Sequence, residues 1–120
     1  MASILIIDDE AGVRALLRTV LEMAGYEVTE ATNGREGLER YRHRPSDLII
    51  TDIGMPEMNG LELTLALTGQ FLDAKVIAIS GVGGDQNALN LAKLLGARHI
   101  LQKPFSMPQL LKAVRYELAH

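Results

Sequence analysis

The chain has 120 residues, a net charge of −3, no cysteine and a hydrophobic content of 48%. This length predicts one domain, residues 1–120, and the acidic balance with only 4% aromatic residues argues against a nucleic-acid-binding surface of its own. No segment reads as a signal peptide or membrane span, and the lack of cysteine fits a reducing compartment, so we expect a cytoplasmic protein.

Five short apolar runs alternate with helical stretches along the chain. The expected strands cover residues 3–7, 26–30, 47–51, 74–79 and 99–102. The first and fourth expected helices cover 12–24 and 86–95. The second is capped by Asn33, which can form a capping box with Glu36, and it ends before Pro45. The third begins near Gly60, and the last is capped by Ser106. Gly25 and Gly96 follow two helices as stop signals.

This alternation predicts an α/β, flavodoxin-like, doubly wound (βα)5 fold. Crossovers between parallel strands are right-handed almost without exception, which leaves few topologies to consider. We expect a five-stranded parallel sheet in the order 2-1-3-4-5 with helices on both faces.

Helical spacing predicts which side chains of each helix face the core. In the first helix the inward stripe is Val13, Leu16, Leu17, Val20 and Ala24, with Arg14, Arg18 and Glu22 facing water. The third helix carries Leu61, Leu63, Leu65 and Leu67. The fourth has Ala88, Leu91, Ala92 and Leu95 inward and Leu89 and Leu94 outside, either as a contact patch or as ordinary exposed leucines. The last has Leu110, Leu111, Val114 and Leu118 inward.

Reactive side chains lie at the ends of four of the five expected strands. Asp8 and Asp9 follow the first strand, Asp52 the third, Ser80 the fourth and Lys103 the last. Because the carboxyl ends of parallel strands meet at one edge of a sheet, we expect these groups to share one cleft. Two carboxylates about 4 Å apart repel by roughly 4 kcal/mol at an effective dielectric constant of 20. The cluster therefore needs a cation or protons.

Oxygen ligands at a partly open edge suit Mg²⁺, and a carboxylate beside Mg²⁺ can attack phosphorus as a nucleophile. Lys103 could pair with the carboxylates or with a phosphoryl oxygen, and a cis bond to Pro104 would aim its ammonium inward. Simpler explanations remain for each group alone: Asp8 and Asp9 as helix caps, Asp52 as a turn former and Lys103 as a surface lysine. Pro56 is expected to stiffen the loop after Asp52, and the glycine-rich segment after Ser80 is either a movable loop or a plain connection.

Together these motifs resemble the response-regulator receiver domain, the phosphoacceptor module of two-component signalling. The resemblance covers essentially residues 3–119 and is carried by residues 4–10, 52–60, 78–81 and 102–105. It implies that Asp52 accepts a phosphoryl group from a phosphohistidine on a sensor histidine kinase or phosphotransfer protein. It also implies that Mg²⁺ is bound directly by Asp9, more indirectly by Asp8, and by Asp52 and the main-chain carbonyl of Gly54.

The resemblance further implies that Ser80 and Lys103 contact the phosphoryl group. Such domains are switches that catalyse only their own phosphorylation and dephosphorylation, not turnover enzymes. They signal to a downstream target through the face made by the fourth helix, last strand and last helix, as monomers or phosphorylation-dependent homodimers. Their phosphodonor docks at the first turn of the first helix, where Val13, Arg14 and Leu17 are candidates.

Three positions depart from the family pattern. Ile100 stands where an aromatic residue often couples the site to the output surface, so only a smaller movement of the same kind is available. Gly54 and Val82 stand at positions that tune hydrolysis, so we expect a phosphorylated lifetime that no side chain there assists.

Three other functions fit the sequence less well than the switch does. A phosphorylation-independent interaction module would usually lose an acidic or lysine position, and this chain has lost none. A hydrolase of the haloacid-dehalogenase type needs a general acid where Gly54 stands, and an FMN carrier would meet repulsion from Asp8, Asp9 and Glu10. The sequence leaves open whether the domain stands alone or is part of a longer regulator.

Overall fold

A computed structural model describes residues 1–55, 58–80 and 86–120, except for the side chains of 86–89. Within these residues five strands alternate with five helices: β1 (Ser3–Ile7), α1 (Ala11–Met23), β2 (Glu27–Ala31), α2 (Gly34–His43), β3 (Leu48–Asp52), α3 (Gly60–Gln70), β4 (Val76–Ser80), α4 (Gln86–Leu94), β5 (His99–Gln102) and α5 (Met107–Ala119). Every expected element is present, but β2 and β3 begin one residue later than expected and β4 begins two residues later. No helix of the described residues is long and apolar enough to cross a bilayer.

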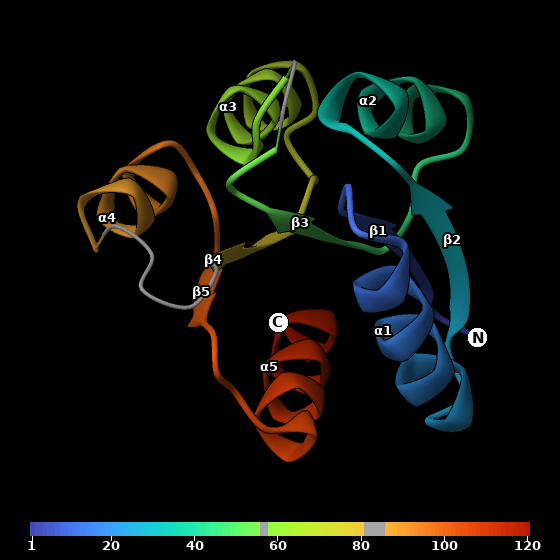
Figure 1. Ribbon diagram of the computed structural model, residues 1–120. Helices are drawn as coiled ribbons and strands as arrows, with labels where there is room; N and C mark the ends of the chain where they lie inside the picture. The colour runs from blue at the N-terminus through green and yellow to red at the C-terminus, as the bar shows by residue number, and fades with distance from the viewer. Residues whose placement is uncertain (56–57, 81–85) are drawn as a thin grey trace.

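The strands form one parallel sheet in the order β2-β1-β3-β4-β5, as the sequence predicts. Figure 1 shows α1 and α5 on one face of this sheet and α2 and α3 on the other. The central strands are covered on both faces, which explains why they read as continuous apolar runs rather than as alternating ones. The fold is therefore the doubly wound α/β sheet expected from the sequence.

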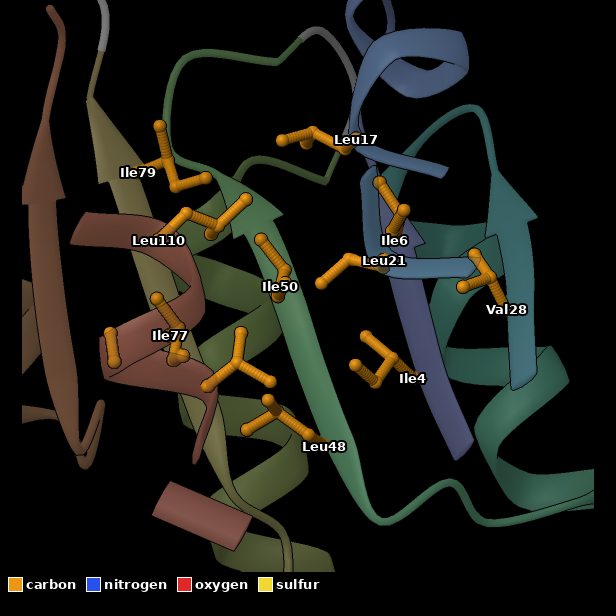
Figure 2. Packing of buried hydrophobic residues seen from close by; sticks show 12 residues of the cluster. Ile4, Ile6, Leu17, Leu21, Val28, Leu48, Ile50, Ile77, Ile79 and Leu110 are labelled. Carbon is orange, nitrogen blue, oxygen red and sulfur yellow. The ribbon is translucent and has the colours of Figure 1, made fainter. Parts of the chain in front are cut away.

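Alternate residues of the central strands β1, β3 and β4 build two separate cores. Ile4, Ile6 and Ile50 point toward α1 and α5, where Leu17, Leu21 and Leu110 meet them (Figure 2). On the opposite face, Leu5, Ile7 and Ile49 pack against side chains of α2 and α3. This is the period-two alternation of a strand buried on both sides. A third, smaller cluster under α4 contains Ile53, Ala78, Ala92 and Ala97, with Leu61 and Ile100 packed against it.

The inward face of α1 differs from the expected one. Leu16 is 55% exposed, whereas Leu21, which was not in the expected stripe, is fully buried. The buried face follows the four-residue spacing Val13–Leu17–Leu21, and consecutive helical residues are about 100° apart, so Leu16 points away from it. The expectation that Arg14 faces water is also wrong, because only 14% of its side chain is exposed.

Another leucine assigned to the core is exposed: Leu91 of α4 faces solvent, while Ala92 is fully buried beneath α4. Leu65 of α3, for which no inward position was predicted, is exposed as well. Leu94 is exposed, as expected, and the side chain of Leu89 lies outside the described residues. In α5 the expected inward positions hold: Leu110 and Val114 are buried, and Leu111 and Leu118 pack against the same core.

The helix boundaries follow the expected caps and stops. Asn33 caps α2 by accepting from the Glu36 N–H at 2.8 Å, but the Glu36 carboxylate accepts from the Thr32 N–H, so the expected capping box is incomplete. A complete box stands at Ser106 in α5. Gly25 and Gly96 end α1 and α4 with φ of 95° and 119°, a conformation that favours glycine.

Candidate functional site

The ends of four strands carry the candidate site residues to one edge of the sheet. Asp52 ends β3 opposite Ile79, and Ser80 ends β4 opposite Gln102. The Lys103 N–H donates to the Ser80 main-chain carbonyl at 2.9 Å, which places Lys103 beside the end of β4. Asp8 directly follows β1, the strand on the other side of β3. Residues far apart in sequence therefore meet at this edge because the parallel register aligns their strand ends.

Asp8 is the most deeply buried carboxylate of this edge, with 2% of its surface exposed. The pKa of Asp8 is raised to about 6, chiefly by burial, and the negative charges of Asp52 and Asp9 contribute to this rise. The hydrogen bond from the Glu10 N–H to Asp8 Oδ1, 2.8 Å long, and the positive charge of Lys103 act in the opposite direction. Asp8, Asp9, Asp52 and Lys103 are thus electrostatically coupled, as groups sharing one site must be.

The acidic cluster extends to Glu10, which the sequence analysis did not include as a ligand. Carboxylate oxygens of Asp8, Asp9 and Glu10 lie within 4.8 Å of one another. Glu10 is the N-cap residue of α1 and no side-chain hydrogen bond caps this helix, so Asp8 and Asp9 do not serve as its caps. A buried carboxylate grouped with further carboxylates fits a hard divalent cation with oxygen ligands, such as Mg²⁺.

The main chain around Asp52 is closely packed, and its carboxylate contacts the backbone of the loop that follows β3. Asp52 is 8% exposed, and its Oδ1 accepts from the Gly54 N–H at 3.2 Å. Behind it, the Thr51 hydroxyl donates to the Asp52 carbonyl, and the start of α3 packs so tightly that a Cβ on Gly60 would clash with that carbonyl. Gly54 itself is exposed, with nothing within 4 Å of the position a Cβ would take.

Lys103 influences the site through the electrostatic effect of its charge on Asp8, and it forms no direct ion pair with the residues described. Its peptide bond to Pro104 is cis, which is the isomer that the sequence allowed for. No ion pair of Lys103 shorter than 4.0 Å occurs among the residues that the structure describes. The expected pairing with a carboxylate is therefore absent there, although Lys103 still lowers the pKa of Asp8.

The remaining sequence-based expectations concern the loops after β3 and β4 and the residue Ile100. Pro56, Val82 and the glycine-rich segment after Ser80 lie outside the described residues. Ile100 is partly buried and packs against the small cluster under α4 that includes Ala78 and Ala92. The position that the sequence analysis linked to signal output therefore contacts the core beneath α4.

Besides Glu10, Arg14 contacts this site, a contact that its sequence-based placement on the water-facing side of the first helix did not predict. Arg14 Nη1 donates to the main-chain carbonyl of Asp8 at 2.6 Å, and Arg14 Nε donates to Glu30 Oε1 at 3.1 Å. Both partners lie at strand ends, Asp8 after β1 and Glu30 near the end of β2. An arginine in the first turn of a helix that follows an acidic strand end was the available signal, but its direction depends on tertiary packing.

Comparisons of the sequence and of the structure with known proteins all indicate the same family. Residues 4–115 match the family described as the response regulator receiver domain. The chain is similar to a chemotaxis protein CheY from Thermotoga maritima, with 38% identity over 112 residues and 92% of each chain covered. It is also similar to the response regulator receiver protein CpdR from Brucella abortus, with 36% identity and coverage of 95% of this chain and 94% of the other. A solved receiver domain from Clostridium thermocellum superposes with a TM-score of 0.93 at 30% identity, covering 99% of this chain and 95% of the other.

Proposed function

The chain belongs to the response regulator receiver domain family, and on that premise we propose that it is a phosphoacceptor switch whose phosphorylated residue is Asp52. The donor is a phosphohistidine on a sensor histidine kinase or phosphotransfer protein. A carboxylate oxygen of Asp52 forms the new bond to phosphorus as the bond from phosphorus to the imidazole nitrogen breaks. The imidazole leaves with the electron pair of that bond and takes up a proton.

The observation that carries this proposal is the position of Asp52. It is an almost buried carboxylate at the end of β3, electrostatically coupled through Asp8 to the rest of an acidic cluster and to Lys103. Phosphoryl transfer depends mainly on positioning and charge neutralisation, and these groups supply both.

Each remaining group has a defined part in the proposed reaction. Asp8, Asp9, Asp52 and the main-chain carbonyl of Gly54 would hold Mg²⁺, which, when bound, neutralises the phosphoryl oxygens. Lys103 offers its ammonium to the same oxygens from the end of β5, and the Ser80 hydroxyl, at the end of β4, donates a hydrogen bond to them. Gly54 has no side chain that could hold an attacking water, so we propose that hydrolysis of the phosphorylated state proceeds without such help.

We propose that output passes to the face formed by α4, β5 and α5. Ser80 lies opposite Gln102 in the sheet, and Ile100 on the same strand packs against Ala78 and Ala92. A shift of Ser80 toward a phosphoryl group would therefore reach α4 through a small movement of Ile100 rather than through rotation of an aromatic ring.

The wider setting follows from the same proposal. Residues 1–120 act as one receiver domain in the cytoplasm, with no direct nucleic-acid or membrane partner. The protein works as a monomer or as a phosphorylation-dependent homodimer and controls a downstream protein target.

Intact-mass measurement tests the proposed function. The wild-type protein incubated with acetyl phosphate and Mg²⁺ should gain the mass of one phosphoryl group, and Asp52→Asn should gain none. Asp73→Asn is the matched control, because Asp73 is an exposed aspartate in the turn before β4, at the opposite edge of the sheet, and should still be phosphorylated. If folded wild-type protein gained no mass, the phosphoacceptor proposal would be wrong and a phosphorylation-independent interaction module would replace it. If Asp52→Asn gained as much mass as wild type, the assignment of Asp52 as the phosphorylated residue would be wrong.

A further inference from the structure

Arg14 connects the acidic site to β2, the outermost strand on one side of the sheet. Its side chain is only 14% exposed, and its guanidinium uses two donors: Nη1 toward the Asp8 carbonyl at 2.6 Å and Nε toward Glu30 at 3.1 Å. The carbonyl that it holds belongs to the peptide between Asp8 and Asp9. The orientation of this peptide sets the direction in which both aspartates leave the main chain.

The Asp8 carbonyl lies just past the end of the sheet ladder. The last paired residues of β1 and β2 are Ile7 and Ala31, and the Asp8 N–H still donates to the Ala31 carbonyl at 3.2 Å. In a longer parallel pairing the Asp8 carbonyl would accept from the N–H of residue 33, but β2 ends at Ala31 and Asn33 is already the N-cap of α2. Arg14 thus supplies to the Asp8 carbonyl the donor that a longer β2 strand would otherwise provide.

Glu30 in turn holds Arg14 in place. One carboxylate oxygen of Glu30 accepts from Arg14, and the other accepts from Arg18 Nη1 at 2.6 Å. These hydrogen bonds, that of Arg18 first, lower the pKa of Glu30, so the carboxylate stays charged. A guanidinium can reach a carboxylate and a carbonyl at once through its rigid fork, which a lysine ammonium cannot reproduce.

The effect of Arg14 is geometric rather than electrostatic. Its charge sits beside the opposite charge of Glu30, and the cation that lowers the pKa of Asp8 is Lys103. What Arg14 contributes to the site is the fixed orientation of one peptide group.

We propose that Arg14 is a positioning residue that, braced by Glu30, holds the Asp8–Asp9 peptide so that the acidic cluster is preorganised for a divalent cation. The inference rests on the proposed function, since it concerns the Mg²⁺ site of that switch. Removing the outer support of a metal ligand typically weakens metal affinity about tenfold or more.

Arg18 provides a matched control for the proposed role. It lies one helical turn after Arg14, binds the same glutamate, and donates to the Val28 carbonyl of β2 at 3.2 Å instead of to the acidic site. An arginine that merely ties α1 to β2 would behave like Arg18. Comparing Arg14→Lys with Arg18→Lys therefore separates positioning of the site from attachment of the helix.

The experiment measures Mg²⁺ affinity calorimetrically without any phosphodonor, and thermal stability in a chelator. Arg14→Lys should bind Mg²⁺ about tenfold more weakly than wild type. Arg18→Lys should stay within about twofold, since its partly exposed ion pairs contribute little. The two variants should lose similar thermal stability. Glu30→Gln keeps Arg14 but weakens its brace, and should weaken Mg²⁺ binding to an intermediate degree.

The outcomes separate this inference from the proposed function. If wild-type protein bound no Mg²⁺, the proposed function would fail and this inference with it. If wild type bound Mg²⁺ while Arg14→Lys bound equally well, or no more weakly than Arg18→Lys, only the positioning role would be wrong. Should Arg14→Lys not fold, Glu30→Gln decides, and unchanged Mg²⁺ affinity in that variant would overturn the proposal.

Discussion

The burial of Asp8 changes the pKa of a carboxyl group at the centre of the site. Its carboxyl has an ordinary pKa of 3.8 and a pKa of about 6 in the folded protein, chiefly because it is buried. The folded state therefore binds this proton more tightly than the unfolded chain does. The resulting stabilisation is complete below pH 3.8 and is lost as the pH rises through about 6, where the folded protein must hold a buried negative charge.

Asp8→Asn should stabilise the cation-free protein at alkaline pH. The amide oxygen can still accept the Glu10 N–H while the buried charge is removed. Each pKa unit corresponds to about 1.4 kcal/mol, so the free energy of unfolding should rise by about 1–3 kcal/mol at about pH 8 and by much less at about pH 4. Urea denaturation in a chelator measures this difference.

Two comparisons complete the Asp8 experiment. Asp73→Asn removes an exposed carboxylate and should change stability little at either pH. Adding Mg²⁺ should stabilise the wild type more than Asp8→Asn, because a bound cation offsets the buried charge. Lower stability of Asp8→Asn at both pH values in the chelator would contradict this account.

Single residues of the site were predictable from the sequence to different degrees. Asp8, Asp52, Ser80 and Lys103 could be grouped because each stands at a strand end, and parallel strands bring such ends together. Arg14 could not be added to the group. Its direction depends on how α1 turns against β2, which brings Glu30 within hydrogen-bonding distance and which no local pattern encodes.

At the scale of elements, the start of α3 packs directly against the end of β3. A Cβ at Gly60 would clash with the Asp52 carbonyl and would lie 2.7 Å from Ile53 Cα, and neither backbone atom can move freely. A complete capping box between Asn59 and Glu62 fixes where the helix begins. The position of α3 and the position of Asp52 are therefore linked through one glycine.

Gly60→Ala should destabilise the protein and disturb Asp52, whereas Gly69→Ala should do neither. Overpacking against backbone typically costs about 1–3 kcal/mol. Gly69 lies in the same helix with nothing within 4 Å of its added Cβ, so alanine there should stabilise by about 0.5–1 kcal/mol through helix propensity. Chemical denaturation and the rate of phosphorylation by acetyl phosphate measure both effects. Equal stability changes in the two variants would show that the close contact at Gly60 does not restrict the fold.

The order and kind of the elements followed from the sequence better than their orientations did. In α1 the leucines at 16 and 17 both fitted an apolar stripe, and only packing on β1 and β2 selects Leu17 and leaves Leu16 exposed. In α5 a carboxylate lies among the apolar positions, since Glu117 is buried and accepts from Arg98 Nε at 3.0 Å. Such a buried charge is tolerated only with its partner, and the partner is far away in sequence.

At the scale of the molecule, the two cores share a single sheet. Ile49 and Ile50 are neighbours in β3, yet Ile49 belongs to the core under α2 and α3, and Ile50 to the core under α1 and α5. The apolar runs of the sequence could predict that both faces are covered, but not which helix covers which residue. Because every central strand contributes to both cores, neither layer retains its packing surface once the other has unfolded.

Ile49→Val and Ile50→Val should therefore destabilise the same cooperative transition. Each removes one methylene from a fully packed position and should lower the free energy of unfolding by about 1 kcal/mol. NMR signals of Leu63 in α3 and Leu110 in α5 report on opposite layers, and in a urea titration both should disappear at one midpoint in each variant. A shift of the Leu63 midpoint alone in Ile49→Val, with Leu110 unchanged, would mean that the layers unfold independently and that the sheet does not couple them.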